Sequence, residues 1–357
     1  MDIIKAIASE LNVRNNQVEA AVKLIDEGCT IPFISRYRKE ATGALNDEQL
    51  RNLDERLKYL RNLEDKKAQV IASIAEQGLL TDELKNQIEK ADTMVAVEDL
   101  YRPYRPKRRT RATIAKEKGL EPLANVILLQ MTGEPVVKTA EEYVSEEKDV
   151  KTPEDAVAGA KDIIAESISD NADYRTRIRE LTFKEGVLTS AAKDAEAKTV
   201  YEMYYNFSEP AAKMAGHRIL AVNRGENEKI LTVKIEAPVD KILAYLEKQI
   251  IVRDNQYTTG IIKEAIEDSY ERLIAPSIER EIRNQLTETA EAGAIKVFGK
   301  NLEQLLLQPP ITGHVVLGWD PAFRTGCKLA VVDATGKVLD TTVIYPTACL
   351  LYTSPSP

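Results

Sequence analysis

Histidine and cysteine are scarce in this chain of 357 residues, which has two histidines (His217 and His314) and three cysteines. The cysteines, Cys29, Cys327 and Cys349, are odd in number, lie far apart and lack Cys-x-x-Cys spacing. Neither a disulfide framework nor a zinc site is therefore expected. With so few of these side chains, the sequence offers no grouping for nucleophilic catalysis or metal binding. We therefore expect a protein that is not an enzyme and that binds no metal and no cofactor.

Long apolar runs are also missing. No stretch reaches the length needed to span a membrane, and residues 1–12 are amphipathic rather than a charged-then-apolar signal. We therefore expect a cytoplasmic protein with no membrane partner. Aromatic residues make up only 6% of the chain and charged residues 30%, with a net charge of −8. An acidic balance argues against wholesale wrapping of nucleic acid, so any binding must come from local patches.

Apolar residues recur at helical spacing through most of the chain, which predicts a mainly α fold. Asn46 followed by Gln49 is typical of a capping box, and the leucines that follow form a stripe typical of a bundle core. We predict an elongated multi-helix domain over residues 1–200 and a central helical region over residues 201–310. The central region should contain one short strand, ILTVKIEAP, and a long helix broken near Pro276.

After His314 the apolar period changes to two. The segments HVVLGWD, CKLAVVD and KVLDTTVIYP predict three short strands, the second and third joined by a tight turn. We expect residues 311–347 to begin an α/β domain. Residues 348–357 are rich in serine and proline and are expected to lie outside that domain.

Cations are concentrated in Leu100–Ala124, which we call the cationic segment. Pro103 and Pro106 disfavour helix at the residues before them, so we predict an extended backbone with Tyr101 and Tyr104 interleaved. Extended backbone, guanidinium donors and aromatic faces suit a phosphate chain. The predicted nucleic-acid contacts are Tyr101, Arg102, Tyr104, Arg105, Lys107, Arg108, Arg109, Arg111 and Lys116.

An alternative interpretation has equal weight. The cationic segment could be a solvent-exposed strap whose cations pair with the protein's own carboxylates. A second cationic group, Arg36, Arg38 and Lys39, follows the apolar residues of a predicted short helix. Because Glu40 stands beside it, we expect this group to pair on the helix surface rather than to bind a ligand.

Several stretches together resemble the bacterial Tex family of transcription accessory proteins. They are IPFISRYRKEATGALNDEQLRNLDERLKYL, IASIAEQGLLTDELKNQIEKA, EDLYRPYRPKRRTRATIAKEKGLEPLA, HRILAVNRGENEKIL and VVLGWDPAFRTGCKLAVVDATGKVLDTTVIYP. The resemblance covers residues 1–347 in the order of the family. It implies an elongated helical N-terminal region with a helix-turn-helix-like part, then an RNase H-like domain of the YqgF type. Helix-hairpin-helix modules and an RNA-binding OB-fold domain follow in the family. We expect this chain to be an N-terminal fragment that ends inside the RNase H-like domain.

The resemblance implies a non-catalytic scaffold that binds RNA or DNA and acts with transcription. An alternative function is a protein-interaction scaffold on polymerase or ribosome, with the transcription or translation machinery as its partner. Asp320 occupies the position where nucleases of the RNase H type place their first metal-binding carboxylate, so a metal-dependent RuvC-like nuclease is the alternative. A turn-capping role for Asp320 is favoured over that alternative.

Overall fold

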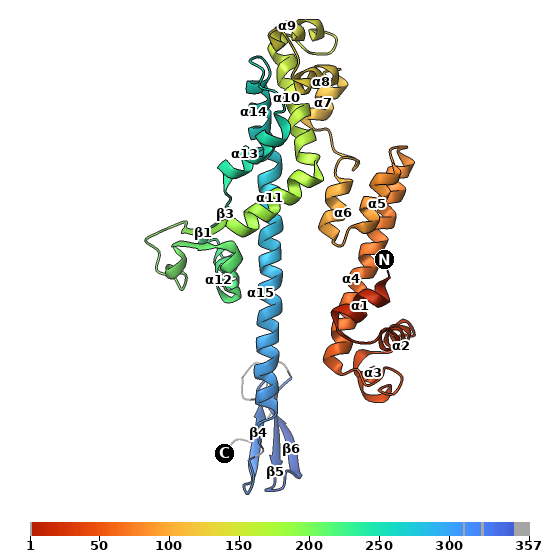
Figure 1. Ribbon diagram of the computed structural model, residues 1–357. Coiled ribbons are helices and arrows are strands. Elements are labelled where there is room, and N and C mark those ends of the chain that lie inside the picture. Colours follow the sequence, from red (N-terminus) through yellow and green to blue (C-terminus); the bar gives the residue numbers. More distant parts are fainter. Residues whose placement is uncertain (1, 310, 323–324, 346–357) are drawn as a thin grey trace. The chain divides into compact units, whose positions relative to one another are not determined.

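The computed structural model describes residues 2–309, 311–322 and 325–345, and the predicted tail at residues 348–357 lies outside them. The fold is mainly α, as predicted, with two small antiparallel sheets (Figure 1). Two compact units are present, one running from Met1 to Ala290 and the other beginning at Glu291. Among the described residues, no helix is long and apolar enough to cross a membrane.

The first helices of the chain share one apolar core, and we call them the N-terminal body. They are α1 (Ile3–Glu10), α2 (Asn15–Asp26), α3 (Ile31–Tyr37), α4 (Asp47–Glu76), α5 (Asp82–Lys90) and α6 (Met94–Tyr101). The leucine stripe of α4 is buried in this core, as predicted. The predicted capping box is confirmed, because the Gln49 backbone N–H donates to Asn46 Oδ1 at 2.8 Å and the Asn46 backbone N–H donates to Gln49 Oε1 at 3.0 Å.

A second core lies in residues 112–290. Its helices are α7 (Arg111–Glu117), α8 (Glu121–Leu129), α9 (Val136–Ala140), α10 (Pro153–Asp170), α11 (Ala172–Glu185), α12 (Gly216–Asn227), α13 (Val239–Ile250), α14 (Thr259–Asp268) and the first half of α15 (Ala275–Leu306). Short 3₁₀ turns are η1 (Glu141–Tyr143), η2 (Glu202–Tyr204) and η3 (Ala211–Lys213). The predicted break near Pro276 takes the form of a π-helical segment, η4 (Ser269–Ile274), after which α15 begins.

The predicted single strand of this region is part of a three-stranded antiparallel sheet in the order β2-β1-β3. The predicted strand is β3 (Leu231–Glu236), whereas β1 (Val187–Ala192) and β2 (Asn206–Pro210) were not predicted. β1 has little β-branched character and β2 ends in a proline, so neither carries a strong strand pattern. The central strand β1 pairs with both neighbours. These backbone hydrogen bonds stabilise β1 and β2 although their own sequences do not favour strands.

The second unit holds the three strands predicted after His314. They are β4 (Val316–Asp320), β5 (Cys327–Val332) and β6 (Val338–Ile344), paired antiparallel in the order β4-β5-β6. Most side chains of β4 and β6 are exposed, including those of Leu317 and Trp319. The sheet therefore has little apolar core within the described part of this unit.

Candidate nucleic-acid interface

The backbone of the cationic segment is mostly not extended, which corrects the prediction. Tyr101 is the last residue of α6, residues 102–105 form a turn, and α7 begins at Arg111. Residues 106–110 are the main stretch of the segment that is neither helix nor turn. The cause is local hydrogen bonding: the Arg102 N–H donates to the Glu98 carbonyl, and Thr110 Oγ1 accepts from the Thr113 N–H at 3.0 Å, which caps α7.

Tyr101 and Tyr104 anchor the segment to the N-terminal body. Both rings are half-buried against the core of that body. The Tyr101 hydroxyl is hydrogen-bonded to Ser73 Oγ at 3.0 Å, and Gln77 Nε2 donates to the Tyr104 carbonyl at 3.0 Å. Their packing gives them a structural role, and the segment starts from a fixed position on α4.

Part of the predicted cationic set is paired with the protein's own groups. Lys107 forms ion pairs with both Glu166 and Asp170 of α10. Lys116 lies 3.5 Å from Glu121, and Lys118, outside the predicted set, pairs with Asp149 at 3.2 Å. For these cations, the internal pairing that the sequence left open is the arrangement in the structure.

Other cations of the segment have either no partner among the described residues or one exposed partner. Arg108 makes no hydrogen bond or ion pair with any described residue, and the same holds for the Arg111 side chain. The side chain of Arg105 is 66% exposed and meets Glu98 only at 3.8 Å, while that of Arg109 is 71% exposed and lies 3.2 Å from Glu117. Exposed pairs of this kind are weak, so the carboxylates do not prevent these guanidinium groups from contacting a polyanion.

A cavity of about 460 Å³ lies beside the segment and carries charges of both signs. Its charged lining consists of Glu98, Arg102, Arg105, Lys107, Arg111, Asp162, Glu166, Asp170 and Arg272. Burial raises the pKa of Asp170 above its usual value, although the hydrogen bond from Lys107 opposes the shift. Burial likewise raises the pKa of Asp162. The pKa of Arg102 is lowered, mainly by burial and also by the nearby positive charge of Arg175. Both carboxylates are thus easier to protonate than ordinary aspartates.

Beside Arg102 of the cavity wall, a buried charge cluster joins α6 to α11 and α15. The fully buried Arg175 donates from Nε to Asp99 at 2.7 Å and from Nη2 to Glu281 at 2.9 Å. Arg179 donates to the same two carboxylates at 2.7 and 2.8 Å. Ser277 Oγ accepts from Arg175 at 2.9 Å and lies 3.5 Å from Arg102 Nη2. The cluster therefore fixes where the cationic segment leaves α6.

Sequence reasoning missed Glu166, Asp170 and Arg272 of the cavity and the whole buried cluster. Glu166 and Asp170 are four residues apart and so share a face of α10, which was the one available signal. Their partner Lys107 lies 59 and 63 residues away in the chain, and no local pattern links residues at that separation.

Asp320 ends β4 as predicted and stands opposite Lys328 in the β4–β5 register. Asp333 instead caps the β5–β6 turn, where its Oδ1 accepts from the Thr335 N–H at 2.8 Å and the Lys337 N–H at 3.0 Å. Over residues 2–309, 311–322 and 325–345, there is no group of three or more His, Cys, Asp or Glu side chains placed to hold a metal ion.

Several known proteins resemble this chain over nearly its whole length. YdcI of Bacillus subtilis (strain 168) is 54% identical over 345 residues, which are 96% of this chain and 48% of that protein. The transcriptional accessory protein Tex of Neisseria gonorrhoeae is 41% identical over 355 residues, 97% of this chain and 46% of that protein. S1 RNA-binding domain-containing protein 1 of Homo sapiens is 31% identical over 360 residues, 96% of this chain and 36% of that protein. The chain spans about half the length, or less, of these curated relatives.

Three family models match successive parts of the chain. The Tex-like protein N-terminal domain matches residues 1–75, the Tex central region-like model matches residues 132–298, and the Tex protein YqgF-like domain matches residues 314–352. All three models describe parts of one family, and together they cover most of the sequence in the predicted order. From its N-terminal helices to its C-terminal strands, the chain belongs to the Tex family.

Proposed function

We propose that this protein binds RNA or DNA through phosphate contacts made by the cationic segment, as a non-catalytic accessory factor of transcription. Arg105, Arg108 and Arg109 are the proposed contacts, with Arg111 and Arg102 reaching the same ligand from the cavity wall. Guanidinium groups suit this task because they donate two parallel hydrogen bonds to a phosphate.

The observation that carries the proposal is the open set of guanidinium groups on a backbone fixed at both ends. Tyr104 holds one end on α4, and Lys107 and Thr110 hold the other on α10, where Thr110 Oγ1 donates to Glu166 at 2.9 Å. Between these anchors, Arg108 has no described partner, and Arg105 and Arg109 each have one exposed pair. Fixed backbone and free cations lower the ordering cost of binding.

The relatives support the nucleic-acid class of ligand. One of them is called a transcriptional accessory protein, and another is called an S1 RNA-binding domain-containing protein. Because the chain spans about half of those proteins or less, we assign it only the phosphate contact and not their complete activity.

The test is the salt dependence of oligonucleotide binding by the 357-residue chain. Arg105, Arg108 and Arg109 alone would neutralise three phosphates, so log K should fall with log salt with a slope at least as steep as about −2 to −3. Arg108→Gln with Arg109→Gln should reduce that slope by about 1.4 to 1.8 and weaken binding to RNA and DNA alike.

A matched control is Arg177→Gln with Arg224→Gln, which removes two exposed cations elsewhere in the same unit. This control should leave the slope nearly unchanged. A slope that stays the same in the Arg108 and Arg109 variant, or that falls equally in the control, would overturn the assignment of the cationic segment as the contact.

The non-catalytic part of the proposal has its own test. Labelled RNA or DNA incubated with the protein and Mg²⁺ should remain intact at the level of an Asp320→Asn variant. Cleavage that Mg²⁺ supports and that Asp320→Asn abolishes would replace this part of the proposal with a nuclease function.

A further inference from the structure

Helix α3 and the loop that leads from it into α4 carry a cationic group that does not pair as predicted. Arg36 and Lys39 make no side-chain hydrogen bond or ion pair with any described residue, and the side chain of Arg38 donates only to the Tyr37 carbonyl, at 3.1 Å. Glu40 is the single acid among residues 31–45. The exposed Arg14 lies beside Gly43 of the same loop and adds a fourth cation. The local charge is therefore positive in a protein whose net charge is −8.

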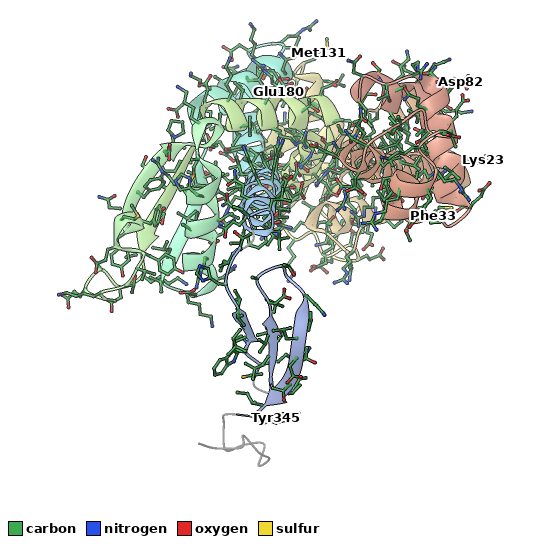
Figure 2. The ribbon with its side chains drawn as sticks, turned by 90° about the horizontal axis from the view of Figure 1, so that it is seen from below. Lys23, Phe33, Asp82, Met131, Glu180 and Tyr345 are labelled. Carbon is green, nitrogen blue, oxygen red and sulfur yellow. The ribbon has the colours of Figure 1, made fainter. Side chains whose placement is uncertain are left out.

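Two aromatic rings lie among these cations. The ring centroids of Phe33 and Tyr37 are 5.4 Å apart, and the Arg38 guanidinium lies over the Phe33 ring at 5.1 Å from its centroid. Tyr37 is 66% exposed, and Phe33 lies at the periphery of the N-terminal body in Figure 2. We call Arg14, Phe33, Arg36, Tyr37, Arg38 and Lys39 the α3 patch. An exposed ring with cations around it is the combination that proteins use to bind unpaired bases.

The loop beneath the patch is held in one conformation. Thr42 is fully buried and its Oγ1 donates to the Arg38 carbonyl at 3.2 Å, while Gln17 Nε2 donates to the Gly43 carbonyl at 2.8 Å. Ala44 has a φ of +63°, a left-handed conformation that non-glycine residues rarely adopt. Gly43 has a φ of +60°, which favours glycine, and a Cβ there would also lie 3.0 Å from Gln17 Nε2. Such strain persists where the surroundings impose it and is common at binding sites.

We infer that the α3 patch is a second nucleic-acid site, one that binds a single strand by stacking an unpaired base on Tyr37. Arg36, Lys39 and Arg14 would contact the adjoining phosphates. An unpaired strand fits better than a duplex, because the bases of a duplex are already stacked and cannot reach an isolated ring. This inference does not require the cationic segment to bind, since α3 leads into one end of α4 and Tyr104 is held at Gln77, beyond the other end.

The first experiment places a fluorophore at the stacking position. The native chain has one tryptophan, Trp319, so Tyr37→Trp combined with Trp319→Phe gives a single reporter in the α3 patch. Short oligo(dT) and oligo(U), each too short to reach along α4, should quench this reporter to saturation, and a blunt duplex should not. RNA and DNA arms compare the two sources of an unpaired base.

The native chain, with Trp319 alone and 56% exposed, is the control for collisional quenching. Quenching of the introduced indole no greater than that of Trp319, or stronger quenching by duplex than by single strands, would overturn the inference. Saturable quenching that persists with Arg108→Gln and Arg109→Gln supports the α3 patch whether or not the cationic segment binds.

The second experiment tests the same contacts by affinity for the short single strand. Tyr37→Ala should weaken binding by about 5-fold or more, Tyr37→Phe should retain it, and Arg36→Gln with Lys39→Gln should weaken it and reduce the salt slope. The Arg177→Gln and Arg224→Gln control should change neither quantity. Because Tyr37 is exposed, the thermal midpoint should stay the same in these variants. Equal affinity of Tyr37→Ala and Tyr37→Phe in folded protein would overturn the stacking role.

Discussion

At the scale of single residues, the fully buried Arg175 determines how the N-terminal body is joined to α11 and α15. Its charge is balanced by Asp99 and Glu281, which it shares with Arg179. Burial alone would raise the pKa of Glu281, but the hydrogen bond and charge of Arg179 and the charge of Arg175 lower it overall. Removing one carboxylate from such a cluster leaves a guanidinium without its counterion in the protein interior.

Asp99→Ala should therefore destabilise the protein by about 3 to 5 kcal/mol. Urea unfolding of the two single variants Asp99→Ala and Glu180→Ala measures this. Glu180 pairs with Arg177 at 3.3 Å on the exposed side of α11, and its loss should cost less than about 1 kcal/mol. Similar losses for both variants would show that burial of the Asp99 pair adds nothing to its strength.

The shifted carboxylates of the cavity predict a pH-dependent affinity. Burial raises the pKa of Asp170, so this group takes up a proton at a pH above its ordinary value of 3.8. Protonation removes a negative charge from the cavity while Glu166 still holds Lys107 on α10, so oligonucleotide binding should strengthen as pH falls through the acid range. Asp170→Asn should bind more tightly at neutral pH and lose the part of this pH dependence that Asp170 supplies, while Asp162 still titrates.

The control for the pH prediction is Asp82→Asn, an exposed acid in the first turn of α5. Fluorescence anisotropy titrations of labelled oligonucleotide at several pH values measure the affinity, and this variant should retain the pH profile of the native protein. A profile that is identical in the Asp170→Asn variant and the native protein would exclude Asp170 as the titrating group.

At the scale of elements, glycines inside two helices have opposite surroundings. A Cβ at Gly159 in α10 would lie 2.4 Å from Cδ1 of the buried Leu120, whereas a Cβ at Gly293 in α15 would meet nothing within 4 Å. Gly293→Ala should raise the stability of α15 by up to about 1 kcal/mol through helix propensity.

Gly159→Ala should lower stability despite the same propensity gain, because overpacking costs about 1 to 3 kcal/mol. Thermal unfolding followed by far-UV circular dichroism distinguishes the two variants. A Gly159→Ala protein as stable as Gly293→Ala would mean that Leu120 can move aside without cost.

The helices were the predictable part of the fold. Asn46 and Gln49 indicated the start of α4, where their capping box is formed. The sheet β2-β1-β3 was predictable only in β3, because β1 and β2 are stabilised by pairing with distant strands rather than by their own composition. For the candidate interface, the sequence located the cations but not their partners. Lys107 is paired with carboxylates of α10 that lie far away in the sequence. The absence of a partner for Arg108 among the described residues likewise follows from the tertiary structure and not from its sequence neighbours.

At the scale of the molecule, the two units differ in how well they bury apolar side chains. The N-terminal body buries its leucine stripe completely, whereas β4 and β6 are edge strands with exposed Leu317, Trp319 and Val338. Hydrogen-bonded strands without a covering core open at low free energy. Exposed apolar edges also favour association between chains.

Amide hydrogen exchange should therefore be much faster in β4–β6 than in the buried turns of α4. Mass spectrometry of peptides from both regions, recorded at several protein concentrations, measures this difference and reveals any association. Protection of β5 equal to that of α4 at low concentration would contradict the prediction.

Helix α4 also sets a spacing. At a rise of 1.5 Å per residue, its length from Asn46 to Gln77 separates the start of the cationic segment from the loop of the α3 patch by about 45 Å. A strand long enough to bridge that span would engage its second site at the high effective concentration of a tethered ligand. Affinity should then rise in a single step at a threshold strand length, and the helix would serve this protein as a molecular ruler.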